Sequence, residues 1–366
     1  ETFESEPTIV EHPIDLHPGP SRHSFEMWIP EPRLWWPWDH GLPDLYRLCL
    51  EVWQDGRLLD SERCTFGLRQ IECQDWTLRV NGRPVYVRGA NWVPADILPG
   101  GVGRADYEAL LGQARQANMN MLRVWGGGLR EKRAFYELCD RLGMLVWQEL
   151  PLACAFLTRY PRSQGFLQLL EAESRAIVRE LRNHASLAIW CGGNEFSPRR
   201  NAPLVEVMAK VVDQRDPTRP FVPASPGPND SHNWQVWHHG RPPQTYRRDT
   251  ALFASEFGLQ APPRPATLQR FLPAEEVEAP GPAWVFHGAG LGKLERYARP
   301  FLPAGATSLE EWIEAGQRAQ ARGLQIAIEH YRRRKAQGGG GVLVWQLNEP
   351  WPAISWALID YYRQPK

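Results

Sequence analysis

The pattern of hydrophobic and polar residues changes near residue 85. Before this point, short runs alternate apolar and polar residues between Pro- and Gly-containing turns, as in SRHSFEMWIP, LYRLCLEVWQDGRLLD and ERCTFGLRQIE. A period of two is typical of strands with one buried face, and QDGR between two such runs is typical of a hairpin turn. Residues 1–75 are therefore predicted to form most of a small β-sandwich.

After residue 85 the chain repeats strand, loop and helix. The strands are mostly continuous apolar runs, which indicates strands covered on both faces of a parallel sheet. Eight of them with intervening helices predict an α/β fold, a (β/α)8 TIM barrel, over residues 76–366. An open doubly wound sheet is the alternative, but no Gly-rich phosphate-binding fingerprint follows the first strand. The expected strands are Val85–Ala90, Met119–Trp125, Met144–Glu149, Leu187–Asn194, Phe221–Ser225, His232–Trp237, Leu252–Glu256 and Val342–Gln346, and the expected helices span residues 104–117, 130–142, 165–183, 202–214 and 308–336.

Two carboxylates end predicted strands of this barrel. Glu195 follows the apolar run of the fourth strand, in SLAIWCGGNEFSP, and Glu256 ends the seventh, in ALFASEFGLQ. Because the reactive groups of such barrels lie at the C-terminal ends of the strands, we expect both glutamates at one mouth. Other polar or aromatic residues at strand ends are expected to converge there: Asn91, Trp92, Arg123, Trp125, Gln148, Glu149, His232, Trp234, Trp345 and Gln346.

Two opposed carboxylates in an aromatic-lined pocket are typical of glycoside hydrolysis. One must carry a proton for the leaving oxygen, and the other must be ionised to attack the anomeric carbon. Burial and like-charge repulsion raise one pKa, whereas hydrogen bonds hold the other pKa down. Asn194, beside Glu195, is placed to bind a sugar 2-hydroxyl. The alternative is that the glutamates form buried ion pairs with Arg123 or Arg88 and carry no chemistry.

Composition narrows the class of protein. The 366 residues carry no formal net charge, which gives no reason to expect a nucleic-acid or membrane partner. Seventeen Trp residues are many for this length, and we expect some of those beside polar residues at strand ends to stack on sugar faces. HH at residues 238–239 and IEHY at residues 328–331 lack the spacing of a zinc or calcium site, so neither a metal nor a cofactor is expected.

The six Cys residues form no CxxC pair, and Cys139, Cys154 and Cys191 lie in apolar contexts, so we expect reduced, buried thiols. No run of 18 apolar residues and no charged-then-apolar leader occurs. Unpaired thiols without a leader suggest a cytoplasmic location. The chain starts without Met in the middle of a pattern, which suggests a fragment of a longer protein, and its oligomeric state is left open.

WCGGNE and FASEFG resemble the acid/base and nucleophile segments of glycoside hydrolase family 2, whose members are retaining barrel enzymes. Within that family the chain is most similar to the β-mannosidases, through GANWVPAD, RVWGGG, FYELCDRLGMLVWQELPLACA, SHNWQVWHHG and VLVWQLNEPWPAISWALIDY. LWWPWDHGLPDLYRL resembles the family's immunoglobulin-like second domain, which implies that the sandwich of residues 1–75 is immunoglobulin-like. The resemblance spans nearly the whole chain and implies hydrolysis of terminal β-D-mannosyl residues of an oligosaccharide or glycoconjugate.

The resemblance also implies a role for each site residue. Glu195 would be the acid/base and Glu256 the nucleophile of a double displacement, with carboxyl groups about 5 Å apart. Arg123 would lie under the nucleophile and hold it ionised. The other expected substrate contacts are Asn194 on the 2-hydroxyl, Trp345 as the platform, Trp92, Trp125, Trp234 and Trp237 around the subsites, Tyr246 as a partner of the nucleophile, and His232 and His238 as sugar contacts or wall residues.

Several positions depart from the family pattern. Relatives more often have Asn at the position of Gly193, and Asp at those of Glu149 and Glu349. The family's first domain, a jelly-roll sandwich that reaches an acidic side chain into the sugar pocket, has no counterpart here, and the chain stops where relatives continue into the last barrel helix. Two alternatives therefore stay open. One is another family 2 glycosidase, such as an exo-β-glucosaminidase, a β-galactosidase or an endo-β-mannosidase, and the other is a truncated, non-catalytic glycan-binding remnant.

Overall fold

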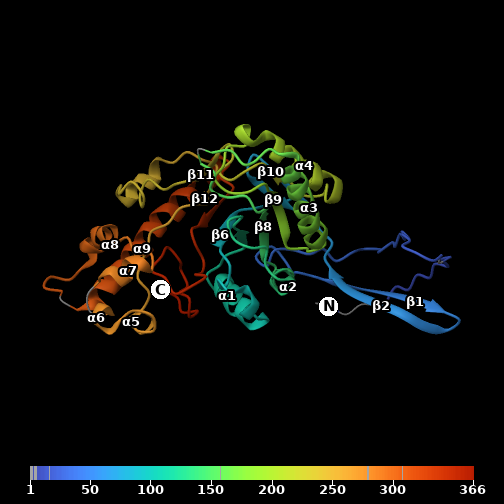
Figure 1. The fold of residues 1–366 in the computed structure, drawn as a ribbon, viewed down its shortest axis with the longest axis horizontal. Helices are drawn as coiled ribbons and strands as arrows, with labels where there is room; N and C mark the ends of the chain where they lie inside the picture. Colours follow the sequence, from blue (N-terminus) through green and yellow to red (C-terminus); the bar gives the residue numbers. More distant parts are fainter. Residues whose placement is uncertain (1–2, 4–5, 16, 157, 278–279, 307) are drawn as a thin grey trace.

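A computed structural model describes residues 3, 6–15, 17–156, 158–277, 280–306 and 308–366. Its centre is a sheet of eight strands, in which all neighbouring strands are parallel (Figure 1). From one edge to the other, the strands are β10 (Phe221–Val222), β9 (Leu187–Cys191), β8 (Leu145–Glu149), β7 (Met121–Val124), β6 (Val87–Trp92), β13 (Gly341–Val344), β12 (Phe253–Glu256) and β11 (Asp230–His232).

The strand order is that of a (β/α)8 barrel. Around the sheet the strands follow the order of the chain, and the last strand, β13, pairs with the first, β6. In the part of the chain that the structure describes, β10 and β11 form no ladder, so the barrel is open at one seam. Side chains link the two edges there, because Ser225, after β10, donates a hydrogen bond to Asp230 of β11 (3.1 Å). The predicted α/β barrel is confirmed, and the open seam is the difference.

Four helices follow four successive strands and lie outside the sheet (Figure 1). Their apolar faces pack against the outward-facing side chains of the strands in the larger buried cluster, which includes Leu110, Phe135, Val178 and Leu204. These helices are α1 (Arg104–Gln116), α2 (Arg133–Leu142), α3 (Gln164–Leu181) and α4 (Ala202–Arg215), with short 3-10 turns η1 (Pro99–Gly101) and η2 (Arg199–Asn201) before α1 and α4 and η3 (Pro243–Arg248) between β11 and β12.

A long connection with several helices leads from β12 to β13. Its last helix, α9 (Leu309–Arg333), begins at a capping box in which Ser308 accepts from the Glu311 backbone N–H (3.2 Å).

All five expected helices are present within a few residues of their predicted ends. The sequence did not predict the short helices of this Pro-rich connection, which are α5 (Pro265–Leu268), α6 (Ala274–Val277), α7 (Pro282–Phe286) and α8 (Leu291–Ala298), with the 3-10 turns η4 (Arg299–Phe301) and η5 (Arg334–Gln337).

A small antiparallel sheet closes the N-terminal end of the barrel. It consists of β3 (Ile71–Gln74), β4 (Thr77–Val80) and β5 (Arg83–Val85). Trp76, in the turn between β3 and β4, stacks on Trp147 (ring centroids 5.5 Å apart), a residue of the barrel interior. Side chains thus fill this end of the barrel, which leaves the C-terminal ends of the strands as the side from which a ligand would approach.

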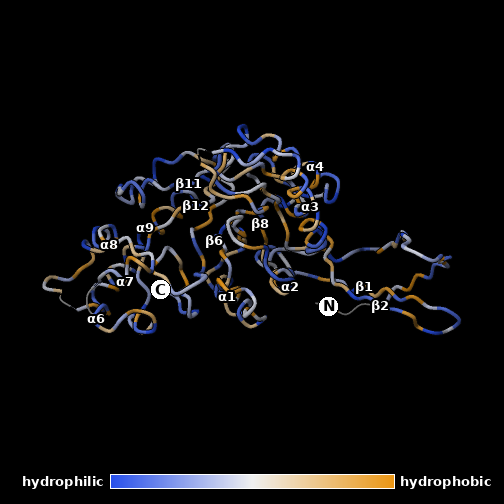
Figure 2. Tube along the Cα trace, in the orientation of Figure 1, coloured by the Kyte–Doolittle hydropathy of each residue, from blue (hydrophilic) through white to orange (hydrophobic). Residues whose placement is uncertain are grey.

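The N-terminal region contains one long hairpin, β1 (Tyr46–Gln54) and β2 (Arg57–Phe66), which projects away from the barrel (Figure 1). Apolar residues run along both strands (Figure 2), and Trp53 and Leu59 are exposed. The prediction of a sandwich agrees with the structure only in part. The hairpin is present, but the described residues of this region contain no second sheet that covers it. The domain boundary at residue 75 stays a prediction, and the β3–β4 hairpin straddles it.

One strand differs from its predicted position. The sixth strand was expected at His232–Trp237, but β11 ends at His232 and the chain then turns, with the His238 N–H bonded to the Trp234 carbonyl (2.8 Å). The apolar run that suggested a strand belongs to this turn. Among the described residues, no helix has both the length and the apolar character needed to cross a membrane.

Candidate active site

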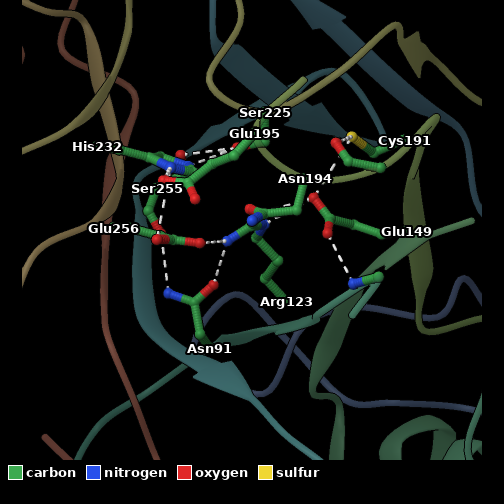
Figure 3. Close-up of polar contacts among 12 residues, drawn as sticks. Asn91, Arg123, Glu149, Cys191, Asn194, Glu195, Ser225, His232, Ser255 and Glu256 are labelled. Atoms are coloured by element: carbon green, nitrogen blue, oxygen red, sulfur yellow. Dashed lines mark hydrogen bonds and ion pairs between the residues drawn. The ribbon is translucent and has the colours of Figure 1, made fainter. Parts of the chain in front are cut away.

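Arg123 of β7 is the centre of the polar network at the mouth of the barrel (Figure 3). Its Nε and Nη2 both donate to Glu149 Oε1 (3.0 and 2.7 Å), and its Nη1 donates to Glu256 Oε1 (2.6 Å). The same guanidinium donates to the side-chain carbonyls of Asn91 and Asn194 (both 2.5 Å), so all five of its N–H groups are used. Burial by itself would lower the pKa of Arg123, but the carboxylates of Glu149 and Glu256 outweigh it and keep the side chain charged.

His232, the last residue of β11, lies between the two glutamates (Figure 3). Its Nδ1 donates to Glu195 Oε1 (2.8 Å) and lies 3.4 Å from Glu256 Oε2. Its Nε2 contacts Ser225 Oγ (3.0 Å). Asp230 accepts hydrogen bonds from the hydroxyl groups of Ser225 (3.1 Å) and Ser255 (2.7 Å). Asp230 thereby holds Ser225 against the edge of the His232 ring that faces away from the glutamates.

The two glutamates are close enough to act on one bond. One carboxylate oxygen of Glu195, one of Glu256 and one ring nitrogen of His232 all lie within 4.8 Å of one another. Carboxyl groups about 5–5.5 Å apart are typical of retaining glycosidases, whereas about 6.5–9.5 Å leaves room for the water of inverting enzymes. The observed spacing fits the retaining geometry that the sequence predicted.

Burial and charge shift the pKa values of the three groups in different directions. Burial raises the pKa of Glu256, and the charges of His232 and Arg123 offset only part of this effect. Burial would also raise the pKa of Glu195, but the hydrogen bond and charge of His232 outweigh it and lower that pKa. Burial lowers the pKa of His232, but the carboxylates of Glu256 and Glu195 outweigh it and raise that pKa.

For Glu195 and Glu256, the order of the two pKa values is the reverse of the order that the resemblance implies. An acid/base at Glu195 should hold a proton, and a nucleophile at Glu256 should be ionised. Two effects produce the reversal: burial raises the pKa of Glu256, and the hydrogen bond and charge of His232 lower the pKa of Glu195.

The turn after β9 brings Glu195 into the site through unusual backbone conformations. Gly193 has φ +139° and Glu195 has φ +48°. A Cβ at Gly193 would lie 2.1 Å from the Leu152 carbonyl oxygen, so a residue with a side chain does not fit this backbone. The Asn194 N–H bonds to that same carbonyl (2.8 Å), and the Glu195 N–H bonds to the Ser225 carbonyl (2.7 Å). The loops after β8 and β10 thus hold the turn from both sides.

Cys154, in the loop after β8, belongs to the site although the sequence suggested a buried thiol. It is exposed, unlike the buried Cys139 and Cys191, and none of the described cysteines forms a disulfide. Its sulfur lies 4.0 Å from Glu195 Oε2 and accepts from Asn194 Nδ2 (3.6 Å). Its φ of +59° turns the side chain towards the mouth, which an apolar sequence context could not reveal.

Two of the predicted tryptophans line a cavity beside the glutamates. The rings of Trp125 and Trp345 meet edge to face (centroids 5.4 Å apart), and both line a cavity of about 510 Å³. Trp234 is half-buried and packs against His238 (4.8 Å) and Trp356 (5.9 Å). The sugar contacts predicted for these residues stay predictions.

Three predicted contacts lie elsewhere. Trp92 is buried outside the sheet and donates to Glu131 (2.9 Å), because side chains alternate along β6 and its neighbour Asn91 points inward. Trp237 is buried against Tyr297 and Trp356. Tyr246 is fully buried and donates to the Gly258 carbonyl (3.4 Å) rather than to the nucleophile.

Sequence reasoning did not single out several residues of this network. Asn91 and Glu149 were among the strand-end polar residues, but nothing local distinguished them from Gln148, whose side chain bonds to Tyr136 (2.7 Å) in the outer core. Ser225 and Asp230 lie in a Pro- and Gly-containing stretch that is typical of a loop. Of these residues, only Ser255 could have been identified from the sequence, because it directly precedes Glu256.

Among the described residues, the one group of at least three acidic, His or Cys side chains with the spacing of a metal site is Glu195, His232 and Glu256. The Arg123 guanidinium, in contact with Glu256, opposes a cation there.

Comparison with known proteins identifies relatives along the whole chain. The description "Glycosyl hydrolases family 2" matches residues 4–69, and "Glycosyl hydrolases family 2, TIM barrel domain" matches residues 71–226. Beta-mannosidase B of Neosartorya fischeri is 31% identical over 95% of this chain and 46% of its own length. Beta-mannosidase B of Aspergillus terreus is 30% identical over 92% of this chain and 45% of its own length.

Solved structures agree with this picture. A β-D-mannosidase from Dictyoglomus thermophilum superimposes with a TM-score of 0.84 at 36% identity, over 92% of this chain and 45% of that one. An exo-chitosanase of Amycolatopsis orientalis shares the fold, with a TM-score of 0.75 at 21% identity over 90% of this chain and 42% of that one. The chain spans about half the length of the curated relatives it matches.

Proposed function

Because the chain belongs to family 2 of the glycosyl hydrolases, we propose that it hydrolyses the β-glycosidic bond of terminal D-mannosyl residues with retention of configuration. The observation that carries this proposal is the pair Glu195 and Glu256, whose carboxylate oxygens approach within 4.8 Å at the mouth of the barrel. That spacing lets the two groups act on opposite sides of one anomeric carbon.

Glu256 is the nucleophile of the proposed reaction. Its Oε1 is held by Arg123, and its Oε2 attacks the anomeric carbon as the bond to the leaving oxygen breaks. Glu195 gives its proton to that leaving oxygen. A water molecule then attacks the glycosyl–enzyme bond, Glu195 takes up a proton from the water, and Glu256 leaves as a carboxylate.

His232 supplies the proton that Glu195 needs. His232 Nδ1 lies 2.8 Å from Glu195 Oε1, and the carboxylates of Glu256 and Glu195 raise the pKa of His232, which favours a proton on the imidazole. Transfer along this bond gives a neutral Glu195, ready to act as an acid, and a neutral imidazole. The reversed pKa order of the empty site is then a resting state, from which one proton shift produces the catalytic state.

Asn194 and Trp345 are the proposed contacts of the reacting sugar. The Asn194 side-chain carbonyl accepts from Arg123, so its amide group is left to donate, and it does so to the weak acceptor Cys154 Sγ (3.6 Å) and to Glu195. A sugar 2-hydroxyl is a stronger acceptor than a thiol. Trp345 is half-buried at the end of β13 and offers its ring as an apolar platform.

The first test is the release of nitrophenol from 4-nitrophenyl β-D-mannoside. We expect turnover by the chain, and a loss of at least about 10³-fold in kcat for Glu256→Gln, because an amide cannot form the ester intermediate. Glu173→Gln, an exposed residue of α3, is the matched control and should keep full activity. Cleavage of the matching β-glucosaminide at a higher rate than the mannoside would overturn the choice of sugar.

Rescue by azide distinguishes the roles of the two glutamates. In Glu195→Ala, azide should enter the vacated space after the glycosyl–enzyme forms and give a β-mannosyl azide, with retained configuration. In Glu256→Ala it should not, since no covalent intermediate can form. An α-anomer as the first hydrolysis product of the unmodified chain, seen by proton NMR, would contradict the retaining mechanism.

A further inference from the structure

A polar cluster at the open seam of the barrel lies against the side of the His232 ring that faces away from the glutamates (Figure 3). Ser225 follows β10, Asp230 begins β11 and Ser255 belongs to β12, so the cluster joins three strands. Ser225 and Ser255 are fully buried, and the His232 side chain is 4% exposed. The proposed reaction uses the Nδ1 side of the ring, which leaves this cluster without a role.

Asp230 is the acceptor of the cluster. Its Oδ1 accepts from the backbone N–H groups of Ser231 (2.8 Å) and Ser255 (3.0 Å), and its Oδ2 accepts from the two serine hydroxyl groups. An ionised carboxylate accepts hydrogen bonds and donates none, which matches this set of four partners. The hydrogens of both serine hydroxyl groups are therefore directed to Asp230.

This arrangement determines the state of His232 Nε2. A serine hydroxyl has a single hydrogen, and Ser225 gives it to Asp230, so the Ser225 oxygen is left to accept from the ring at 3.0 Å. With its hydrogen aimed at Nε2 instead, Ser225 would face the carboxylate at 3.1 Å with no hydrogen between the two oxygens. In a buried cluster such an unmade hydrogen bond is unfavourable. The seam thus favours a hydrogen on Nε2.

The other side of the ring also meets acceptors. Nδ1 lies 2.8 Å from Glu195 Oε1 and 3.4 Å from Glu256 Oε2, and an imidazole with hydrogens on both nitrogens is the charged form. Burial lowers the pKa of this ring, but the surrounding carboxylates outweigh it and raise the pKa. The charged groups that act on the ring are Glu195 after β9, Glu256 of β12, Asp230 of β11 and Arg123 of β7.

We propose that Asp230 and Ser225 are positioning residues of the reaction, which hold a hydrogen on His232 Nε2 so that the Nδ1 proton is free to pass to Glu195. The inference rests on the proposed function and adds the residues that prepare its acid. When the Nδ1 proton moves to Glu195, the ring becomes neutral and keeps its hydrogen on Nε2, in contact with Ser225. The seam cluster therefore keeps all its hydrogen bonds before and after the transfer.

The variant Asp230→Asn tests this role. The new amide oxygen can keep the two backbone N–H groups, but its Nδ2 donates to both serines, so the Ser225 hydrogen turns to His232 Nε2. The neutral ring then has its hydrogen on Nδ1, and passing that hydrogen to Glu195 would leave an imidazolate anion.

Nitrogen NMR of the labelled imidazole in the substrate-free chain measures this change. In Asp230→Asn the ring of His232 should titrate at least about one pH unit lower, and the neutral ring should carry its hydrogen on Nδ1 instead of Nε2. Asp213→Asn, at an exposed position of α4, is the matched control and should leave the ring unchanged.

Two substrates separate positioning from a structural role. With phenyl β-D-mannoside, whose leaving group needs a proton, Asp230→Asn should move the alkaline limb of kcat/KM down by at least about one pH unit. With 2,4-dinitrophenyl β-D-mannoside, whose leaving group departs without a proton, kcat/KM at the same pH should change less than about twofold.

An unchanged titration and tautomer of His232 in Asp230→Asn would overturn the inference, as would equal losses on the two mannosides. If Asp230→Asn does not fold, Ser225→Ala takes its place. Because this variant removes the acceptor of Nε2–H, the ring should titrate lower, and an unchanged titration would refute the role of the seam. If the unmodified chain cleaves neither mannoside, the proposed function fails, and the NMR titration alone decides whether the two residues set the state of the ring.

Discussion

His232 donates to Glu195 and faces Glu256, so the charge on its ring acts on the pKa of both carboxyl groups. The other charged groups around it are Arg123, which also favours the ionised carboxylates, and Asp230, on the far side of the ring. His232 lowers the pKa of each glutamate below the value that burial alone would set. A single imidazole thus acts on the pKa of both acids of the site.

The variant His232→Asn should narrow the pH–rate profile. Without the imidazolium, the pKa of Glu256 rises, which moves the acidic limb of kcat/KM upward, and the proton of the Glu195–His232 pair is held by a carboxyl group alone, which moves the alkaline limb downward. Both limbs should be followed with 4-nitrophenyl β-D-mannoside. The same substitution at His330 in α9, whose ring contacts a backbone carbonyl and a neighbouring Tyr ring, should leave the profile in place. A lower kcat with both limbs unmoved would show that His232 acts on geometry alone.

The turn after β9 is the element on which the position of Glu195 depends. It is anchored to the loop after β8 by Asn194 and to Ser225, in the loop after β10, by Glu195, both through backbone hydrogen bonds. Gly193 makes this close approach feasible, since its missing Cβ leaves room for the Leu152 carbonyl.

Gly193→Ala should unfold more easily and lose activity. The added methyl would lie 2.1 Å from a carbonyl oxygen at a φ of +139°, so we expect a loss of at least about 2 kcal/mol in the free energy of unfolding. Gly112→Ala is the matched control, because a Cβ at this position in α1 meets no atom within 4 Å. This control should be stabilised by up to about 1 kcal/mol in urea denaturation. Equal stability of the two variants would mean that the turn can relax.

The whole molecule divides into a closely packed barrel and an exposed hairpin. The strands β7, β8 and β9 consist of buried residues, whereas nearly every residue of β1 and β2 is at least partly exposed. A two-stranded ladder without a covered face is marginally stable in water. The barrel, in contrast, has side-chain layers both inside and outside the sheet.

Amide hydrogen exchange should therefore separate the two parts. Amides of β1 and β2 should exchange at least about 10²-fold faster than those of β8, because the hairpin can open without disturbing the barrel. Mass spectrometry of peptides from residues 46–66 and 145–149 measures this directly. Uniform protection across both regions would show that the hairpin and the barrel open as one unit.

Much of the fold and part of the site follow from local sequence. Continuous apolar runs identified seven of the eight barrel strands, and their ends identified Glu195, Glu256 and Arg123, because a strand's direction fixes which of its ends lies at the mouth. The sixth strand was misplaced by a few residues, since an apolar turn and a buried strand look alike in sequence. The short helices after β12 carried too little periodicity to be recognised.

The rest was decided by contacts between residues far apart in the chain. The alternation along β6 places Asn91 inside and Trp92 outside, and no local signal chooses between them. The direction of each pKa shift depends on burial and on the charge of His232, which is 37 positions from Glu195 in the sequence. The cavity beside Trp345 is assembled from four separate loops. Sequence determines local periodicity and residue chemistry, whereas burial and charge–charge distances arise only when the chain has closed into a barrel.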